Sequence, residues 1–147
     1  MKRKVLFLCE TNGLLSPMAE ALLSRMDSKH FDVTSAGTSH GRLHPLTVEV
    51  MKEIGIDLSQ KASRHLEDLR DDPFDYVIAL DESSTRVYED FQSDKRVHWK
   101  FDDPVAASSD PERQLRAFRI VRDQITQRLR LFVIVHVRPL ARSLSAA

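Results

Sequence analysis

Cys9 is the residue of this 147-residue chain best placed for nucleophilic chemistry, and it is the only cysteine. It stands where an apolar run, VLFL, gives way to a short polar loop. Ser16-Pro17 follows as a predicted N-cap and first-turn proline, so the loop leads into a helix. Backbone N–H groups and the helix dipole meet in such a loop, where they favour an anion and the nucleophilic thiolate. The alternative is that Cys9 is a small buried residue without a chemical role.

The pattern of apolar residues predicts the elements that position Cys9. Continuous apolar runs predict buried strands at 5–8, 31–36, 76–80 and 96–99. Helical spacing and capping residues predict helices at 17–26 and 45–54, a short helical piece at 65–69, and a long helix from 110 onwards. Strands that alternate with helices indicate a parallel sheet covered on both faces, with ligands bound at the carboxyl ends of the strands. We expect one domain, residues 1–138, followed by a flexible tail, residues 139–147.

Composition excludes several classes of protein. A single cysteine cannot form an intramolecular disulfide, which argues against a small secreted domain and for a cytoplasmic protein. The formal net charge is zero and no apolar run reaches the ~18 residues of a membrane span, so we expect neither nucleic acid nor a membrane as partner. His40 and His44 have a spacing that can ligate zinc, but they fall in a predicted loop with no third ligand nearby. We therefore expect no metal and no cofactor.

The stretch VLFLCETNGLLSPMAEALL resembles the signature of the low-molecular-weight protein tyrosine phosphatases and of the thioredoxin-coupled arsenate reductases that share their fold. That family carries Cys-x5-Arg-Ser/Thr-Pro-Met-Ala-Glu-Ala after its first strand. TSAGT, PLTVEVMKEIGIDLS, FDYVIAL and HWKFDDP are similar to later landmarks, and the likeness extends to about residue 137. It implies an α/β fold: a single-domain three-layer sandwich whose four-stranded parallel sheet has the order 2-1-3-4, with helices on both faces.

The resemblance also implies a role for individual residues. Cys9 would attack a phosphate or arsenate, Ser16 would hydrogen-bond the thiolate, and Asp103 of the Asp-Pro dipeptide would protonate the leaving oxygen. Asp102 competes for this last role by adjacency. Asn12 would hold the shape of the loop in a left-handed conformation. The oxyanion would be cradled by the backbone of Glu10, Thr11, Asn12, Gly13, Leu14 and Leu15.

The chain departs from the family pattern in three ways. Leu15 replaces the arginine that would clamp the oxyanion, and losing an arginine that faces a transferring phosphoryl group can cost ~10³–10⁵ in rate. Leu14 stands where several phosphatases carry a second loop cysteine, and Asp81 where reductases place a resolving cysteine. A disulfide relay within the chain is therefore impossible, and reduction would need an external thiol such as glutathione or mycothiol. Val105-Ala106 replaces the tyrosines that phosphatases often carry after Asp-Pro.

Three functions are compatible with this signature and its missing arginine. The main one is phosphatase-type hydrolysis of a phosphate ester, or related oxyanion chemistry, at a weak rate. The second is arsenate reduction with an external thiol as partner. The third is a catalytically impaired module that binds an oxyanion or another protein. Arg42 and Arg64 lie in loops expected at the same edge as Cys9, so either is a candidate to replace the missing cation.

Overall fold

The computed structural model describes residues 1–39 and 41–146, with side chains described only as far as residue 137. Its four strands are parallel and form one sheet in the order β2-β1-β3-β4, which confirms the predicted fold class and strand order. The strands are β1 (Arg3–Cys9), β2 (Phe31–Gly37), β3 (Phe74–Ala79) and β4 (Ser93–His98). Because β1 lies between β2 and β3, its last residue reaches the carboxyl edge of the sheet near the centre.

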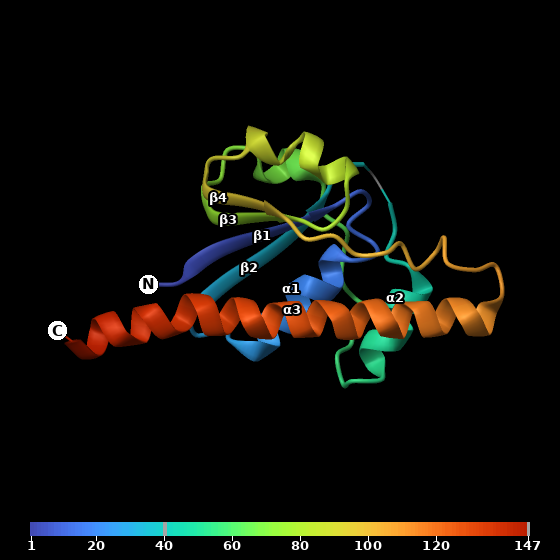
Figure 1. Ribbon diagram of the computed structural model, residues 1–147. Coiled ribbons are helices and arrows are strands. Elements are labelled where there is room, and N and C mark those ends of the chain that lie inside the picture. Colours follow the sequence, from blue (N-terminus) through green and yellow to red (C-terminus); the bar gives the residue numbers. More distant parts are fainter. Residues whose placement is uncertain (40, 147) are drawn as a thin grey trace.

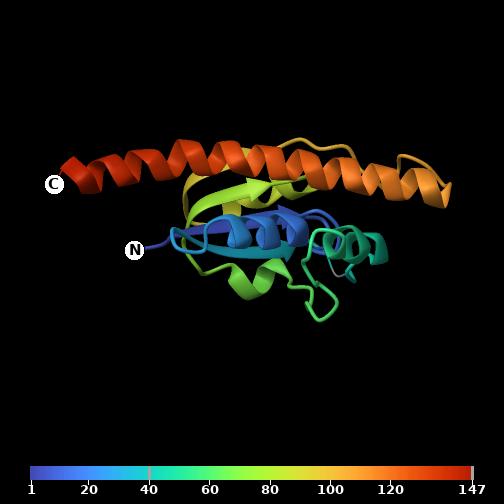
Figure 2. The same cartoon turned by 90° about the horizontal axis from the view of Figure 1, so that it is seen from below.

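Three α-helices lie on one side of the sheet: α1 (Ser16–Met26), α2 (Pro45–Lys52) and α3 (Pro111–Ala146). Figures 1 and 2 show α3 running along this side past α1 and α2 and continuing beyond the sheet towards the C-terminus. With 36 residues, α3 is about 54 Å long. Its apolar stripe, which includes Phe118, Ile125 and Leu129, is buried in the main core. No helix among residues 1–39 and 41–146 is long and apolar enough to cross a membrane.

The last residues of the chain continue α3. The helix extends to Ala146, so most of the segment 139–147 has a helical backbone, and residue 147 lies outside the described residues. The flexibility of this segment, and the domain boundary at 138, stay predictions.

The other side of the sheet is covered by three short 3₁₀ segments, η1 (Leu66–Leu69), η2 (Ser83–Arg86) and η3 (Tyr88–Asp90), over a smaller apolar cluster. η1 lies before β3, at the short helical piece predicted for 65–69, whereas η2 and η3 follow β3, where acids and serines favour a helix start but only single turns form. Side chains satisfy the local backbone, since the Thr85 hydroxyl donates to the Glu82 carbonyl and the Arg96 guanidinium donates to the Tyr88 carbonyl. Such bonds compete with a continuous helix.

Candidate functional site

Cys9 lies at the carboxyl end of β1 and is almost completely buried, with 2% of its surface exposed. Its Sγ is 2.8 Å from the hydroxyl oxygen of Ser16, and it accepts a hydrogen bond from the Ser16 backbone N–H at 3.4 Å. The structure therefore places Cys9 in direct contact with the first residue of α1. Because that N–H belongs to the open first turn of the helix, the sulfur atom takes the place of a helix cap.

Asn12 fixes the orientation of the Ser16 hydroxyl. Its φ of 54° confirms the predicted left-handed conformation, and its side chain is buried. Asn12 Oδ1 accepts from the Arg64 backbone N–H at 2.7 Å, and Nδ2 donates to the hydroxyl oxygens of Ser16 and Ser35, each at 2.9 Å. Since Ser16 Oγ already accepts from Asn12, its own O–H is free to donate to Cys9 Sγ. Two donors directed at Sγ suit a thiolate.

Ser16 does not cap α1, so this part of the sequence prediction is wrong. The N-cap residue is Leu15, which has helical backbone angles (φ −94°, ψ −41°) and makes no side-chain capping bond. The physical reason is that the Ser16 hydroxyl is used by Cys9 and Asn12 instead.

A pocket of about 250 Å³ opens at Cys9. Its walls include most of the residues predicted for the site, and Asp103 lines it whereas Asp102 lines a neighbouring pocket. The lining residues are Cys9, Glu10, Thr11, Leu14, Leu15, Asp81, Ser83, Phe101 and Asp103. Asn12 and Gly13 of the predicted cradle do not line it. Gly13 packs under another loop, so closely that a Cβ there would lie 2.1 Å from the Arg42 carbonyl oxygen.

Asp81 occupies part of the predicted oxyanion cradle. Its Oδ2 accepts from the Glu10 backbone N–H at 2.8 Å, while Oδ1 accepts from the Ser83 hydroxyl at 3.2 Å and the Ser84 N–H at 3.0 Å. A second loop amide, that of Gly13, donates to the Thr11 hydroxyl oxygen at 3.2 Å. Two of the six amides predicted to hold an oxyanion therefore already have acceptors within the chain.

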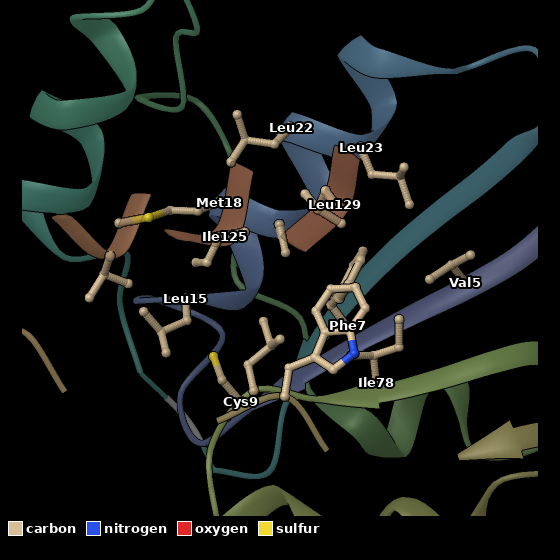
Figure 3. Close-up of a cluster of buried hydrophobic side chains, with 14 of the residues drawn as sticks. Val5, Phe7, Cys9, Leu15, Met18, Leu22, Leu23, Ile78, Ile125 and Leu129 are labelled. Carbon is tan, nitrogen blue, oxygen red and sulfur yellow. The ribbon is translucent and has the colours of Figure 1, made fainter. Parts of the chain in front are cut away.

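Leu15 is part of the hydrophobic core. Only 3% of its surface is exposed, and Figure 3 shows its side chain beside Cys9, on the side towards Met18 and Ile125. The side chain thus makes the wall of the pocket apolar at the position where the family signature has a cation.

The pocket at Cys9 has no positively charged lining residue within the described part of the chain, whereas Glu10, Asp81 and Asp103 contribute three carboxyl groups. Arg64 lines a different pocket, which has Thr11 in common with this one, and Arg42 does not line the pocket at Cys9. Neither candidate arginine therefore lines the pocket at Cys9.

His44 stabilises the start of α2. Its Nδ1 accepts from the Leu46 backbone N–H at 3.1 Å, which caps α2, and its ring stacks on Phe118 at 4.8 Å between centroids. Burial lowers the pKa of His44, and the nearby carboxyl group of Asp103 opposes this shift. His40, its partner in the sequence spacing, lies outside the described residues. Among residues 1–39 and 41–146, no group of three or more potential metal ligands comes together.

Ser83 and Phe101 are pocket residues that sequence reasoning did not identify. An available signal for Ser83 was the Asp-x-Ser-Ser pattern after β3, which favours an aspartate that caps the following turn. No comparable signal marked Phe101, which reaches the pocket from the loop after β4.

The site defines an α/β protein with a nucleophilic thiol in the loop between its first strand and first helix, and with an aspartate that lines the same pocket. The chain belongs to the low molecular weight phosphotyrosine protein phosphatase family, whose model matches residues 4–144. The resemblance predicted from the loop signature is confirmed.

Similar proteins within and around this family include arsenate reductases. One from Halalkalibacterium halodurans is 37% identical over 132 residues, covering 89% of this chain and 95% of the relative. A glutaredoxin arsenate reductase from Synechocystis sp. is 31% identical over 128 residues, covering 86% and 93%. Among solved structures, an arsenate reductase in the phosphate binding state matches with a TM-score of 0.73 and 31% identity, over 91% of this chain and 98% of the other. A low molecular weight protein tyrosine phosphatase from T. tengcongensis matches with a TM-score of 0.72 and 26% identity, over 90% and 98%.

Proposed function

We propose that this chain reduces arsenate slowly, with Cys9 as its only redox-active thiol and an external thiol as the reductant. The observation that carries this proposal is the contact of Cys9 Sγ with two donors of Ser16 at the base of a pocket that Asp103 also lines. The arsenate reductases among its relatives support arsenate as the substrate. The glutaredoxin arsenate reductase supports a thiol outside the chain as partner.

The reaction balances without a second cysteine in the chain. Cys9 Sγ attacks arsenic(V), and one As–O bond breaks as Asp103 supplies the proton that lets the oxygen leave as water. The sulfur of an external thiol then attacks Cys9 Sγ. The S–As bond breaks with its electron pair remaining on arsenic, so arsenite(III) leaves and Cys9 is left in a mixed disulfide. A second thiol releases Cys9, so arsenate and two thiols give arsenite, one disulfide and water.

The charge of the pocket determines which form of arsenate suits it. The carboxylates of Glu10 and Asp81 repel an anion, and the described residues of the pocket wall include no cation that compensates them. A singly charged oxyanion is repelled less than a doubly charged one. We therefore infer that the substrate is the more protonated form, and that binding is weak at neutral pH.

A phosphate ester is the second candidate substrate, because Cys9 and Asp103 can form and break a phosphocysteine by the same displacement. The family supports this chemistry. Leu14, Leu15 and Phe101 give neither oxyanion a cation, but the relatives named above are mostly arsenate reductases, so we place hydrolysis second.

The decisive experiment measures arsenite formed from arsenate with glutathione or mycothiol as reductant. We expect slow arsenite formation that Cys9→Ser abolishes and that Asp103→Asn lowers by about 10²–10⁴. Asp102→Asn is the matched control, because this neighbouring carboxyl group lines a different pocket, and it should leave the rate within about twofold.

The other outcomes distinguish the alternatives. Arsenite formation at the same rate in Cys9→Ser would refute Cys9 as the nucleophile. Cys9-dependent turnover of p-nitrophenyl phosphate that is faster than arsenate reduction would make the chain a phosphatase. If the folded chain forms no arsenite and hydrolyses no ester, yet binds arsenate in a calorimetric titration, it is an oxyanion-binding module.

A further inference from the structure

A second pocket, of about 280 Å³, lies between β4 and the C-terminal half of α3 and shares no lining residue with the pocket at Cys9. We call it the edge pocket, because β4 is an edge strand of the sheet. The edge pocket is lined by four ring side chains and two cations, namely Tyr76, Trp99, Phe132, His136, Lys95 and Arg128.

The ring side chains form one continuous wall. The ring centroids of Trp99 and Phe132 are 5.7 Å apart, with an interplanar angle of 72°, and those of Tyr76 and Phe132 are 5.3 Å apart at 82°. His136 lies 4.4 Å from Phe132. Edge-to-face packing of this kind fixes the rings and leaves a shaped apolar surface. A cavity of about 150 Å³ accommodates benzene, so the edge pocket has room for one ring and its substituents.

The charged side chains that line the edge pocket are both positive. Lys95 and Arg128 line it, form no ion pair within the described part of the chain, and Arg128 stacks over Trp99 with its Cζ 5.2 Å from the ring centroid. Behind the wall, Arg3 Nη1 donates to the Tyr76 hydroxyl oxygen at 2.9 Å. No acidic residue is found among the lining residues described.

His136 also lies near these cations, which affect its pKa. Its Nδ1 lies 3.0 Å from the Tyr76 hydroxyl oxygen. Burial lowers the pKa of His136, and the charges of Lys95 and Arg3 lower it further. Burial and the two neighbouring cations thus both disfavour an additional positive charge at this histidine.

We propose that the edge pocket binds a small aromatic carboxylate, with its ring against the wall of Trp99 and Phe132 and its carboxylate at Lys95 and Arg128. The volume suits one ring, the wall offers the aromatic contact, and the two unpaired cations offer the charge-assisted hydrogen bonds. This site is separate from the chemistry proposed for Cys9 and does not depend on it.

Trp99 is the only tryptophan of the chain, so its fluorescence reports directly on the edge pocket. We expect benzoate, at constant ionic strength, to change this fluorescence saturably. Benzyl alcohol, which lacks the charge, and acetate, which lacks the ring, should give no saturable change. Phenyl phosphate in place of benzoate tests whether the anion must be a carboxylate.

Variants test the assignment of the two cations. Lys95→Gln and Arg128→Gln should each weaken benzoate binding about five- to tenfold, a modest loss because both side chains are exposed. Arg130→Gln is the matched control, since this arginine lies on the same helix but lines a pocket elsewhere. Cys9→Ser should bind benzoate as the unmodified chain does.

Three results would overturn the proposal. One is a response to benzoate that stays linear or that persists unchanged in the folded Lys95→Gln/Arg128→Gln double variant. Another is loss of the response in Cys9→Ser, which would place the benzoate at the other pocket. The third is a sedimentation experiment in which the chain dimerises and Lys95→Gln or Arg128→Gln shifts the dimer to monomer. The edge pocket would then be an interface between two copies.

Discussion

Replacing Leu15 by arginine tests whether the missing cation limits this site. Leu15 has 3% of its surface exposed and packs in the core beside Cys9, while the pocket on its other side contains Asp81 and Asp103. An arginine can therefore leave the apolar cluster and place its guanidinium in a pocket of about 250 Å³ that already contains carboxylates. The substitution should cost stability and increase the affinity for an oxyanion.

The two effects have similar expected sizes in free energy but act on different measurements. Losing a fully buried leucine side chain costs about 1.5–3 kcal/mol, which lowers the melting temperature of a chain of this length by about 4–10 °C. A charge-assisted hydrogen bond to the oxyanion contributes about 1.5–3 kcal/mol, which is about a 10- to 150-fold gain in arsenate or phosphate affinity. Turnover of p-nitrophenyl phosphate should rise more than affinity does, because the guanidinium also stabilises the transition state.

Two assays separate these effects. Calorimetric melting gives the stability of Leu15→Arg, and titration with arsenate or phosphate gives its affinity. Leu15→Met preserves the size of the side chain without charge, and Leu15→Lys supplies charge without the planar fork, so affinity should rise in the order Met, Lys, Arg. If Leu15→Arg melts cooperatively yet binds arsenate no better than Leu15→Met, the oxyanion is not held at this loop and our assignment of the site is wrong.

Three further substitutions test other parts of the structure. Asn12→Ala removes the hydrogen bonds to Ser16, Ser35 and the Arg64 N–H and places alanine in a left-handed conformation. Urea unfolding should therefore show that the free energy of unfolding falls by about 3 kcal/mol or more. Asn12→Asp retains the acceptor for the Arg64 N–H and should lose less stability. Asp81→Asn removes one repelling charge and should tighten arsenate binding severalfold by calorimetry, whereas unchanged affinity would show that Asp81 is not near the bound anion. His44 is held neutral by burial, so the unfolded chain takes up protons first and stability should fall as the pH drops below about 6.5. His44→Asn, which keeps an acceptor for the Leu46 N–H, should lose less stability than the unmodified chain between about pH 7.5 and 5.5, and an equal loss would contradict this explanation.

The strands could be predicted because each depends on a local pattern. Continuous apolar runs mark strands buried on both faces, and they identify β1 and β3 without any knowledge of their neighbours. The left-handed conformation of Asn12 was predicted from the resemblance to the family, and it agrees with the tolerance of asparagine for a positive φ. The turns after β3 could not be predicted, because the acids and serines there also suit the start of a helix. Hydrogen bonds with Asp81 and Arg96 determine that short turns form instead.

The site was less predictable than the fold because its key contacts join residues far apart in sequence. The bond between the Glu10 N–H and Asp81 spans 71 residues. The choice between Asp102 and Asp103 also depends on the tertiary structure, because the loop after β4 turns only one of the two side chains into the wall of the pocket at Cys9. No periodicity within one segment reports either arrangement.

Leu15 and Asp81 both lower the affinity that we expect of the loop for an anion. In the described structure the loop is satisfied in part without a ligand, because Asp81 and Thr11 accept from two of its amides and Leu15 packs in the core. Bound arsenate must therefore compete with the Asp81 carboxylate for the Glu10 N–H. Leu15→Arg and Asp81→Asn should consequently act together. With both changes the guanidinium has one ion-pair partner fewer in the pocket, so the gain in arsenate affinity should exceed the sum of the two single gains in free energy. Strict additivity in this double-mutant cycle would show that the two residues act on the anion independently.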